Sequence, residues 1–186
     1  MPISLDACLV RQCAPTLAGI KAGSLFCLDI DREILVCKII AHWNRMLNTK
    51  NVFAKAVGEK RGLTYIYVYR PNLLNRVLLN GESQSFLKGY GYQKFDVESV
   101  LSHLRERFCV EAIFPHEVGI LLDYPLEDVR EFIVNGGKNS KRIGVWKVYH
   151  NVPNSVQIFD VYRKCQRDMI AQFQEGATLE SLTMVS

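Results

Sequence analysis

Apolar residues recur along the chain at two spacings, one typical of strands and one typical of helices. Residues 63–69 alternate tyrosines with Ile66 and Val68, and this period of two predicts a strand with three tyrosines on one face. Further strands are predicted over 24–30 and over 142–150. These segments indicate a small sheet.

Longer segments carry apolar residues every three or four positions, as amphipathic helices do. Caps and helix-breaking residues bound them, for example Asp96 before one helix and Gly176 after the last. The stretch 48–62 is polar and is predicted to connect elements. Helices therefore outnumber strands, which predicts a helix-rich α+β or α/β fold with a small mixed sheet covered by several helices. The predicted helices run over 4–12, 15–21, 31–48, 71–81, 83–89, 96–109, 125–136 and 153–176.

The first 21 residues are predicted to form two short helices separated by a break at Cys13. Ser4 caps the first, which ends near Gln12, and Pro15 suits the first turn of the second. Cys13 would then lie just outside a helix N-terminus, where the helix dipole and Lys21 stabilise a thiolate. Such a cysteine is a candidate nucleophile, redox sensor or metal ligand. The alternative is a small buried residue in a tight turn.

Composition narrows the class of protein. Hydrophobic residues make up 48% and charged residues 23% of 186 residues, which fits one folded domain over 1–186. No stretch has the length needed to span a bilayer and no secretory signal opens the chain, so we expect a cytoplasmic protein without a membrane partner. The six cysteines are then expected to be free thiols, and they form no C-x-x-C pair.

His116 and Glu117 are the second candidate site. A histidine titrates near neutrality and acts as a base or a metal ligand, so a Cys13–His116 dyad or metal site is one hypothesis. The alternative is a helix start, with Pro115 in the first turn and Glu117 favoured by the helix dipole.

Tyrosine and arginine at the strand 63–69 suggest a third site. Tyr67 lies on the tyrosine face, and Arg70 at the strand end is a natural contact for an anionic group, so both are candidates to bind a flat cofactor. The same tyrosines equally suit a sheet face beneath a helix.

Basic residues cluster around Trp146 and Tyr149, which are further cofactor-binding candidates. Basic side chains beside aromatic rings hold nucleic acids or phosphorylated ligands. The alternative, which the modest charge of +4 favours, is an exposed basic turn before a strand with a buried aromatic side. A helix-turn-helix over 117–134 is disfavoured because carboxylates open its second helix, so a packed pair of helices is predicted instead. The basic residues are Lys138, Lys141, Arg142 and Lys147.

Four segments stand in order along the chain: Cys13–Lys21, Tyr67–Pro71, Phe114–Gly119 running into Tyr124–Val129, and Gly144–Tyr149. In this order they resemble an uncharacterised bacterial family, family 3793 of the domains of unknown function. The resemblance implies a compact, intracellular, one-domain protein and no assigned activity. Family members often carry a histidine before the cysteine of the first segment, where this chain has Gln12.

The common nucleotide, zinc-protease and serine-hydrolase motifs are absent from the sequence. Three hypotheses remain, none of which identifies the cofactor. The first is a binding protein for a small ligand, metal or redox cofactor that uses Cys13, His116 and Glu117. The second is a nucleic-acid-associated or regulatory protein that uses residues 138–147. The third is a thiol-dependent enzyme with Cys13 as nucleophile.

Overall fold

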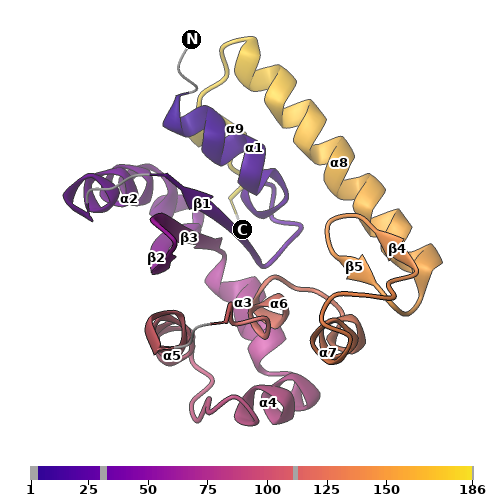
Figure 1. Cartoon of the computed structure of the whole chain (residues 1–186). Helices are drawn as coiled ribbons and strands as arrows, with labels where there is room; N and C mark the ends of the chain where they lie inside the picture. The colour runs from indigo at the N-terminus through magenta and orange to yellow at the C-terminus, as the bar shows by residue number, and fades with distance from the viewer. Residues whose placement is uncertain (1–3, 30–32, 111–112, 186) are drawn as a thin grey trace.

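The structure is a computed structural model that describes residues 4–29, 33–110 and 113–185. This part of the chain is rich in helix and contains a three-stranded sheet and a separate two-stranded hairpin (Figure 1). The helices are α1 (Leu5–Leu17), α2 (Glu33–Leu47), α3 (Pro71–Leu78), α4 (Gly81–Lys88), α5 (Val97–Val110), α6 (Val118–Leu121), α7 (Leu126–Val134), α8 (Val152–Gln174) and α9 (Leu179–Leu182), with a 3-10 turn, η1 (Asn48–Lys50). The strands are β1 (Gly23–Leu28), β2 (Phe53–Lys60), β3 (Leu63–Tyr69), β4 (Arg142–Ile143) and β5 (Lys147–Val148).

The three-stranded sheet has the order β1-β3-β2, and both pairings are antiparallel. The helix-rich α+β prediction is confirmed, but the described strands form no mixed sheet. The physical reason lies in the connection between β2 and β3, where Arg61 (φ 54°) and Gly62 (φ 75°) form a turn too short to join parallel strands. The strand predicted over 63–69 is β3, which is central because its branched and aromatic residues suit a strand covered on both faces.

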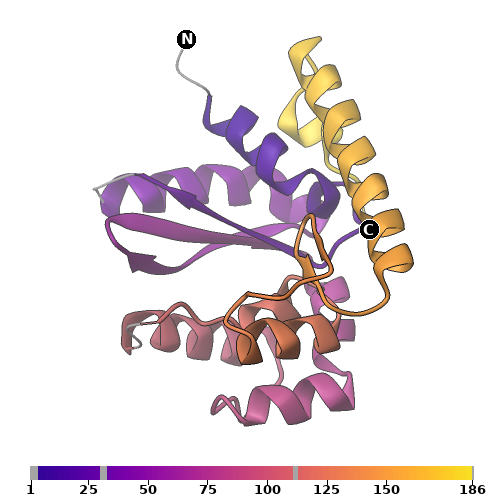
Figure 2. The same cartoon turned by 45° about the vertical axis from the view of Figure 1, so that its right-hand side comes forward.

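The two faces of the sheet support two hydrophobic clusters. On one face, Ile66 and Val68 pack with Trp43 of α2 and with α1. On the other, Tyr67 packs with Phe108 of α5. Figure 2 shows α1 and α2 on one side of the sheet and α5 and α7 on the other, with α8 beside α1. Strand alternation therefore sorts the aliphatic residues of β3 to one core and its tyrosines to the other.

The break predicted at Cys13 is wrong, because α1 is one helix with Pro15 inside it. The predicted Ser4 cap is confirmed, since its side chain accepts from the Ala7 N–H at 3.1 Å. Pro15 has no N–H for the carbonyl oxygen of Arg11, four residues earlier. The Gln166 side chain on α8 donates to that oxygen instead, at 2.6 Å. A contact from a distant helix thus supplies the hydrogen bond that the proline removes.

The stretch predicted as polar connection contains η1 and the strand β2. The side chain of Asn44 on α2 bonds both backbone groups of Ala54, donating to its oxygen at 2.9 Å and accepting from its N–H at 2.7 Å. A bulge follows at Gly58, where a Cβ would collide with the side chain of Phe108. Glycine is therefore required for α5 to approach β2 closely, and it also interrupts the alternation that would have revealed the strand.

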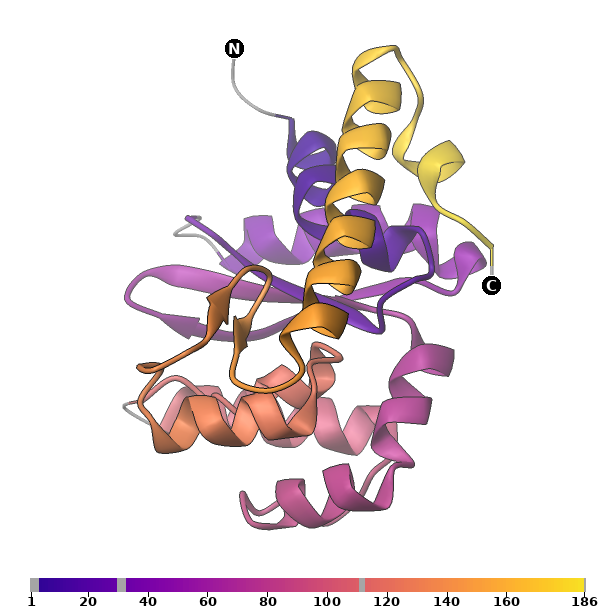
Figure 3. The same ribbon diagram turned by 90° about the vertical axis from the view of Figure 1, so that its right-hand side faces the viewer.

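The strand predicted over 142–150 is also wrong in detail, because this segment is the β4–β5 hairpin. The hairpin lies beside the first turns of α8 (Figure 3). Its Trp146 and Val148 form a third cluster with Phe159 and Tyr162. Gly144 lies in the hairpin turn against the Phe159 ring, where a Cβ would collide. The segment therefore turns back on itself where it packs against the aromatic residues Phe159 and Tyr162 of α8.

Other expectations concern helix ends and caps. The helix predicted to begin at Ser83 begins at Gly81, because Asn80 rather than Ser83 accepts the capping hydrogen bond. The short helix α9 was not predicted. The cap predicted at Asp31 lies outside the described residues. The cap predicted at Asp96 is confirmed, since it accepts from the Ser99 N–H at 2.9 Å.

Candidate functional site

A cavity of about 350 Å³ lies between the β4–β5 hairpin and the segments that carry α6 and α7. We call it the hairpin cavity. Its mouth is at the hairpin, where Ile143 is 70% exposed and Val145 is 40% exposed, whereas Val118 and Trp146 of its lining are buried. The lining residues are Phe114, His116, Val118, Gly119, Leu122, Tyr124, Asp128, Val129, Phe132, Ile143, Gly144, Val145, Trp146 and Lys147.

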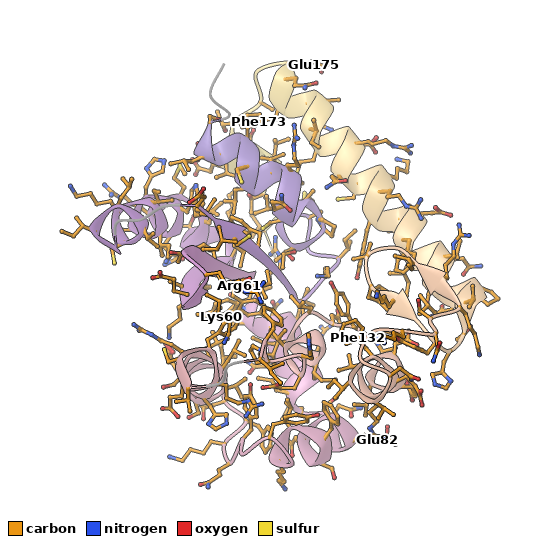
Figure 4. The ribbon with its side chains drawn as sticks, viewed as in Figure 1. Lys60, Arg61, Glu82, Phe132, Phe173 and Glu175 are labelled. Carbon is orange, nitrogen blue, oxygen red and sulfur yellow. The ribbon has the colours of Figure 1, made fainter. Side chains whose placement is uncertain are left out.

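Four aromatic side chains, Phe114, Tyr124, Phe132 and Trp146, contribute to the cavity wall. The ring of Trp146 lies 5.0 Å from that of Tyr124 and 4.5 Å from that of Phe159, which fixes its orientation. Phe132 lies on α7 just below the hairpin in Figure 4, and its ring is 4.9 Å from the imidazole of His116. Packed rings of this kind present flat apolar surfaces with rigid side chains.

Asp128 holds the hairpin over α7. Its Oδ2 atom accepts from the indole N–H of Trp146 at 2.8 Å. Its Oδ1 atom accepts from the backbone N–H groups of Tyr149 at 2.8 Å and His150 at 2.9 Å. The carboxylate is only 2% exposed, so these donors replace the water that it loses on burial. One buried side chain thus sets the position of the wall residue Trp146.

His116 lies in the cavity wall, but Glu117 does not share its surroundings. Burial lowers the pKa of His116 below its usual 6.5, with the Glu117 charge opposing, so the imidazole is neutral near pH 7. Glu117 is buried, accepts from Arg107 Nε at 2.5 Å and lies 3.5 Å from the Tyr92 hydroxyl. The structure confirms the alternative prediction of a helix start at this position, because α6 begins at Val118, directly after Glu117. His116 is therefore a polar group that a ligand in the cavity can contact, while Glu117 belongs to an internal ion pair.

Lys21 and Tyr67 are both buried outside the cavity lining. The Lys21 ammonium donates to the carbonyl oxygen of Gly23 at 2.5 Å and lies 5.2 Å from the centre of the Tyr124 ring. Burial lowers the pKa of Lys21 to about 8, although Cys13 and Asp123 oppose this shift. The Tyr67 hydroxyl donates to the carbonyl oxygen of Leu121 at 2.5 Å. Neither residue lines the cavity: Lys21 lies against the wall residue Tyr124, and Tyr67 bonds a carbonyl oxygen outside the lining.

Arg70 is fully buried and connects separate parts of the fold. Its guanidinium donates to the carbonyl oxygens of Thr16 and Leu17, each at 2.6 Å, at the end of α1. It also reaches Lys50 at 3.1 Å and Met184 at 2.8 Å. These contacts use the donors that the sequence suggested for an anionic ligand. Arg70 is a structural clamp that is closed to solvent.

Tyr149, another cofactor-binding candidate, is also buried, and it does not line the cavity. Its backbone is tied to Asp128, and burial raises the pKa of its phenol. Its hydroxyl has no hydrogen-bond partner among the described residues. Trp146 and Lys147 are neighbours in the sequence, and both line the cavity because Trp146 lies in the hairpin turn, before the strand β5 begins.

Cys13 lies inside α1 and is fully buried in the cluster between α1, α2 and the sheet. Burial raises the pKa of its thiol far above 9.0, although nearby Lys21 opposes the shift. The predicted stabilisation of a thiolate by a helix N-terminus is therefore wrong. Cys13 does not line the cavity that contains His116, so the structure does not bring the proposed dyad together.

Alkylation of the folded protein with iodoacetamide at neutral pH is expected to modify Cys13 last. Cys27, Cys37 and Cys109 are exposed, whereas Cys13 is closed to reagent and protonated, so its rate is expected to be at least ~100-fold lower. Peptide mass spectrometry over time measures the order, and the urea-unfolded chain serves as the control in which this protection is lost. Modification of Cys13 as fast as Cys37 would instead restore it as a nucleophile.

Sequence reasoning missed Asp128, Phe132 and Val118 as site residues. Asp128 was interpreted as a charge in the first turn of a helix, which is its local environment. Its donors lie about 20 residues later in the hairpin, and no local pattern pairs the two segments. The only signal in the sequence was the position of this acidic residue: Asp128 lies between the apolar residues Leu126 and Val129, where a buried side chain is expected.

Within residues 4–29, 33–110 and 113–185, no group of three or more His, Cys, Asp or Glu side chains is placed to hold a metal ion. Cys13 and His116, the residues suggested as metal ligands, belong to different parts of the structure. No helix in the described part is long and apolar enough to cross a membrane.

The fold and the site together define a helix-rich α+β protein with an aromatic cavity beneath a β-hairpin. The chain belongs to the family described as "Protein of unknown function (DUF3793)", whose model matches residues 9–183 and thereby confirms the resemblance seen in the sequence. The matched range contains the whole hairpin cavity. No curated protein and no solved structure matches the chain.

Proposed function

We propose that this protein binds a small, mainly apolar ligand in the hairpin cavity. The observation that carries the proposal is a volume of about 350 Å³ with aromatic walls and one neutral histidine. Small-molecule sites are typically about 300–1,000 Å³, apolar, and furnished with a few polar groups. The space is open at the hairpin, so an apolar ligand that enters it displaces water from apolar walls, which is favourable.

The chemistry of the lining suggests how a ligand is held. Trp146, Phe132 and Tyr124 offer flat surfaces for stacking. His116 offers one nitrogen as a donor and one as an acceptor, because its lowered pKa keeps the ring neutral. Both oxygens of Asp128 are already occupied by protein N–H groups, so Asp128 orients the wall and leaves ligand contact to the others.

The compartment and the extent of the folding unit are also proposals. Six free thiols support a reducing compartment such as the cytoplasm. One domain over 1–186 is supported by the packing of α8 on α1, which joins the two ends of the chain. The nucleic-acid alternative retains its basic residues as support, but an apolar cavity beside them favours a small ligand. Burial of Cys13 leaves the thiol-dependent enzyme without a geometric argument.

The test uses N-phenyl-1-naphthylamine, a neutral two-ring-system probe whose fluorescence rises in apolar surroundings. We expect saturable binding to the natural protein. The variant Val145→Trp is expected to bind at least about fivefold more weakly, because a larger side chain narrows the mouth of the cavity. Val145 is 40% exposed, so the variant is expected to fold.

The matched control is Val161→Trp, the same substitution at a 54% exposed position of α8 that does not line the cavity. It is expected to bind the probe like the natural protein. Absence of saturable binding, or equal weakening by both substitutions, would contradict the proposed function.

A further inference from the structure

Basic residues lie on and next to the segments that line the hairpin cavity. Lys147 belongs to its lining, and its ammonium donates to the carbonyl oxygen of Gly137 at 2.6 Å. Lys141 and Arg142 directly precede the lining residue Ile143, and Lys138 directly follows Gly137. Lys138, Lys141 and Arg142 are exposed. We call these four side chains the basic rim.

No carboxylate neutralises the basic rim. In the described part of the chain, no ion pair joins any of its members to an acidic residue. The sequence contains no Asp or Glu between Glu131 and Asp160. Asp128 lies in the cavity wall, but its oxygens accept from Trp146 and from backbone N–H groups. The positive charge at the mouth is therefore available to a ligand.

The aromatic wall and the basic rim are adjacent surfaces of opposite character. Lys147 belongs to both surfaces. Its ammonium lies 5.8 Å from the centre of the Phe132 ring in the cavity wall, and its backbone is part of the hairpin strand β5. An apolar body gains free energy in the cavity by leaving water. An anionic group on the same molecule gains hydrogen bonds and charge pairing at the rim without being buried.

We infer that the ligand of the hairpin cavity is an amphiphilic anion, with an apolar, ring-containing body in the aromatic cavity and a carboxylate, sulfonate or phosphate at the basic rim. This inference rests on the proposed function and adds the charge of the ligand to it. A neutral apolar molecule uses the cavity alone, and a nucleic acid uses the rim alone. An amphiphilic anion uses both.

Two probes with the same ring systems separate the contributions of cavity and rim. They are 1-anilinonaphthalene-8-sulfonate, which carries a sulfonate, and neutral N-phenyl-1-naphthylamine. The double variant Lys141→Ala/Arg142→Ala is expected to bind the sulfonate roughly tenfold more weakly, since two charge contacts are removed. Its affinity for the neutral probe is expected to stay within about twofold of the natural protein. Added salt is expected to weaken sulfonate binding alone.

The control double variant is Lys38→Ala/Arg45→Ala. Both residues are exposed on α2, which covers the opposite face of the sheet from the cavity, and the change in net charge is the same. It is expected to bind both probes like the natural protein. This control separates an effect of the rim from an effect of total charge.

Each remaining outcome is decisive. Equal sulfonate affinity in the rim variant and the natural protein, with the neutral probe bound, would overturn the inference and leave an apolar cavity as the site. Sulfonate binding that is insensitive to Val145→Trp would also overturn it, because the probe would then lie elsewhere. Failure of both probes to bind would instead remove the proposed function itself.

Discussion

Replacing Arg70 with methionine is expected to lower the free energy of unfolding by about 3 kcal/mol, measured by urea denaturation. Methionine fills part of the volume but removes hydrogen bonds to four backbone carbonyl groups, at Thr16, Leu17, Lys50 and Met184. Part of this loss is offset, because burying the guanidinium itself costs free energy and methionine avoids that cost. The lowered pKa of Arg70 reflects the same cost of burial. The carbonyl groups of α1 also keep one bond each, from Gly19 and Met184 N–H groups.

The control for this prediction is Arg76→Met on the exposed side of α3, which is expected to change stability by less than about 0.5 kcal/mol. Arg70→Lys is expected to restore only a minor part of the loss, since an ammonium cannot reproduce the forked contacts of a guanidinium. A variant Arg70→Met as stable as the natural protein would show that packing alone joins α1, η1 and the C-terminal segment.

Replacing Asp128 with alanine is expected to have the second large effect, on stability and on the cavity together. The indole N–H of Trp146 and the backbone N–H groups of Tyr149 and His150 lose their acceptor, at a cost of about 3 kcal/mol. The hairpin is then no longer fixed over α7. Binding of N-phenyl-1-naphthylamine is expected to weaken at least about tenfold, as measured by fluorescence titration.

Glu127→Ala provides the matched control, because Glu127 lies in the same first turn of α7 and is exposed. It removes the same charge near the helix N-terminus and is expected to cost less than about 1 kcal/mol, without effect on the probe. Asp128→Asn is expected to fall between the natural protein and Asp128→Ala, since one amide oxygen remains. Unchanged probe binding in Asp128→Ala would show that the hairpin holds its position without the carboxylate.

Arg70 and Asp128 use buried charge in similar ways at two places in the fold. Arg70 joins the ends of β3 and α1 to η1 and the C-terminal segment. Asp128 joins α7 to the hairpin and so shapes the candidate site. Each is paired with hydrogen-bonding groups, as burial of a charge requires. The first effect is therefore expected in stability alone, and the second in stability and ligand binding.

The sequence by itself determined the local elements and the family. Strand alternation predicts β3 at its observed bounds, because both of its faces are buried and carry a consistent set of side chains. Caps and apolar spacing predict most of the helices, among them α5 with its Asp96 cap. His116 was singled out because a histidine titrates near neutrality, and Trp146 and the basic residues because basic side chains beside aromatic rings hold phosphorylated ligands. These features depend on neighbours along the chain.

The tertiary structure alone decided which candidates meet. Pro15 breaks no helix because Gln166 of α8 bonds the carbonyl oxygen it leaves free, and this places Cys13 in the core instead of at a helix end. Strand β2 could not be predicted from the sequence because the close approach of α5 requires a glycine at position 58, and this glycine interrupts the strand alternation. Asp128 is a site residue because its carboxylate accepts hydrogen bonds from a hairpin that lies further along the chain. Packing between segments far apart in the sequence sets these outcomes, and local periodicity carries no information about such contacts.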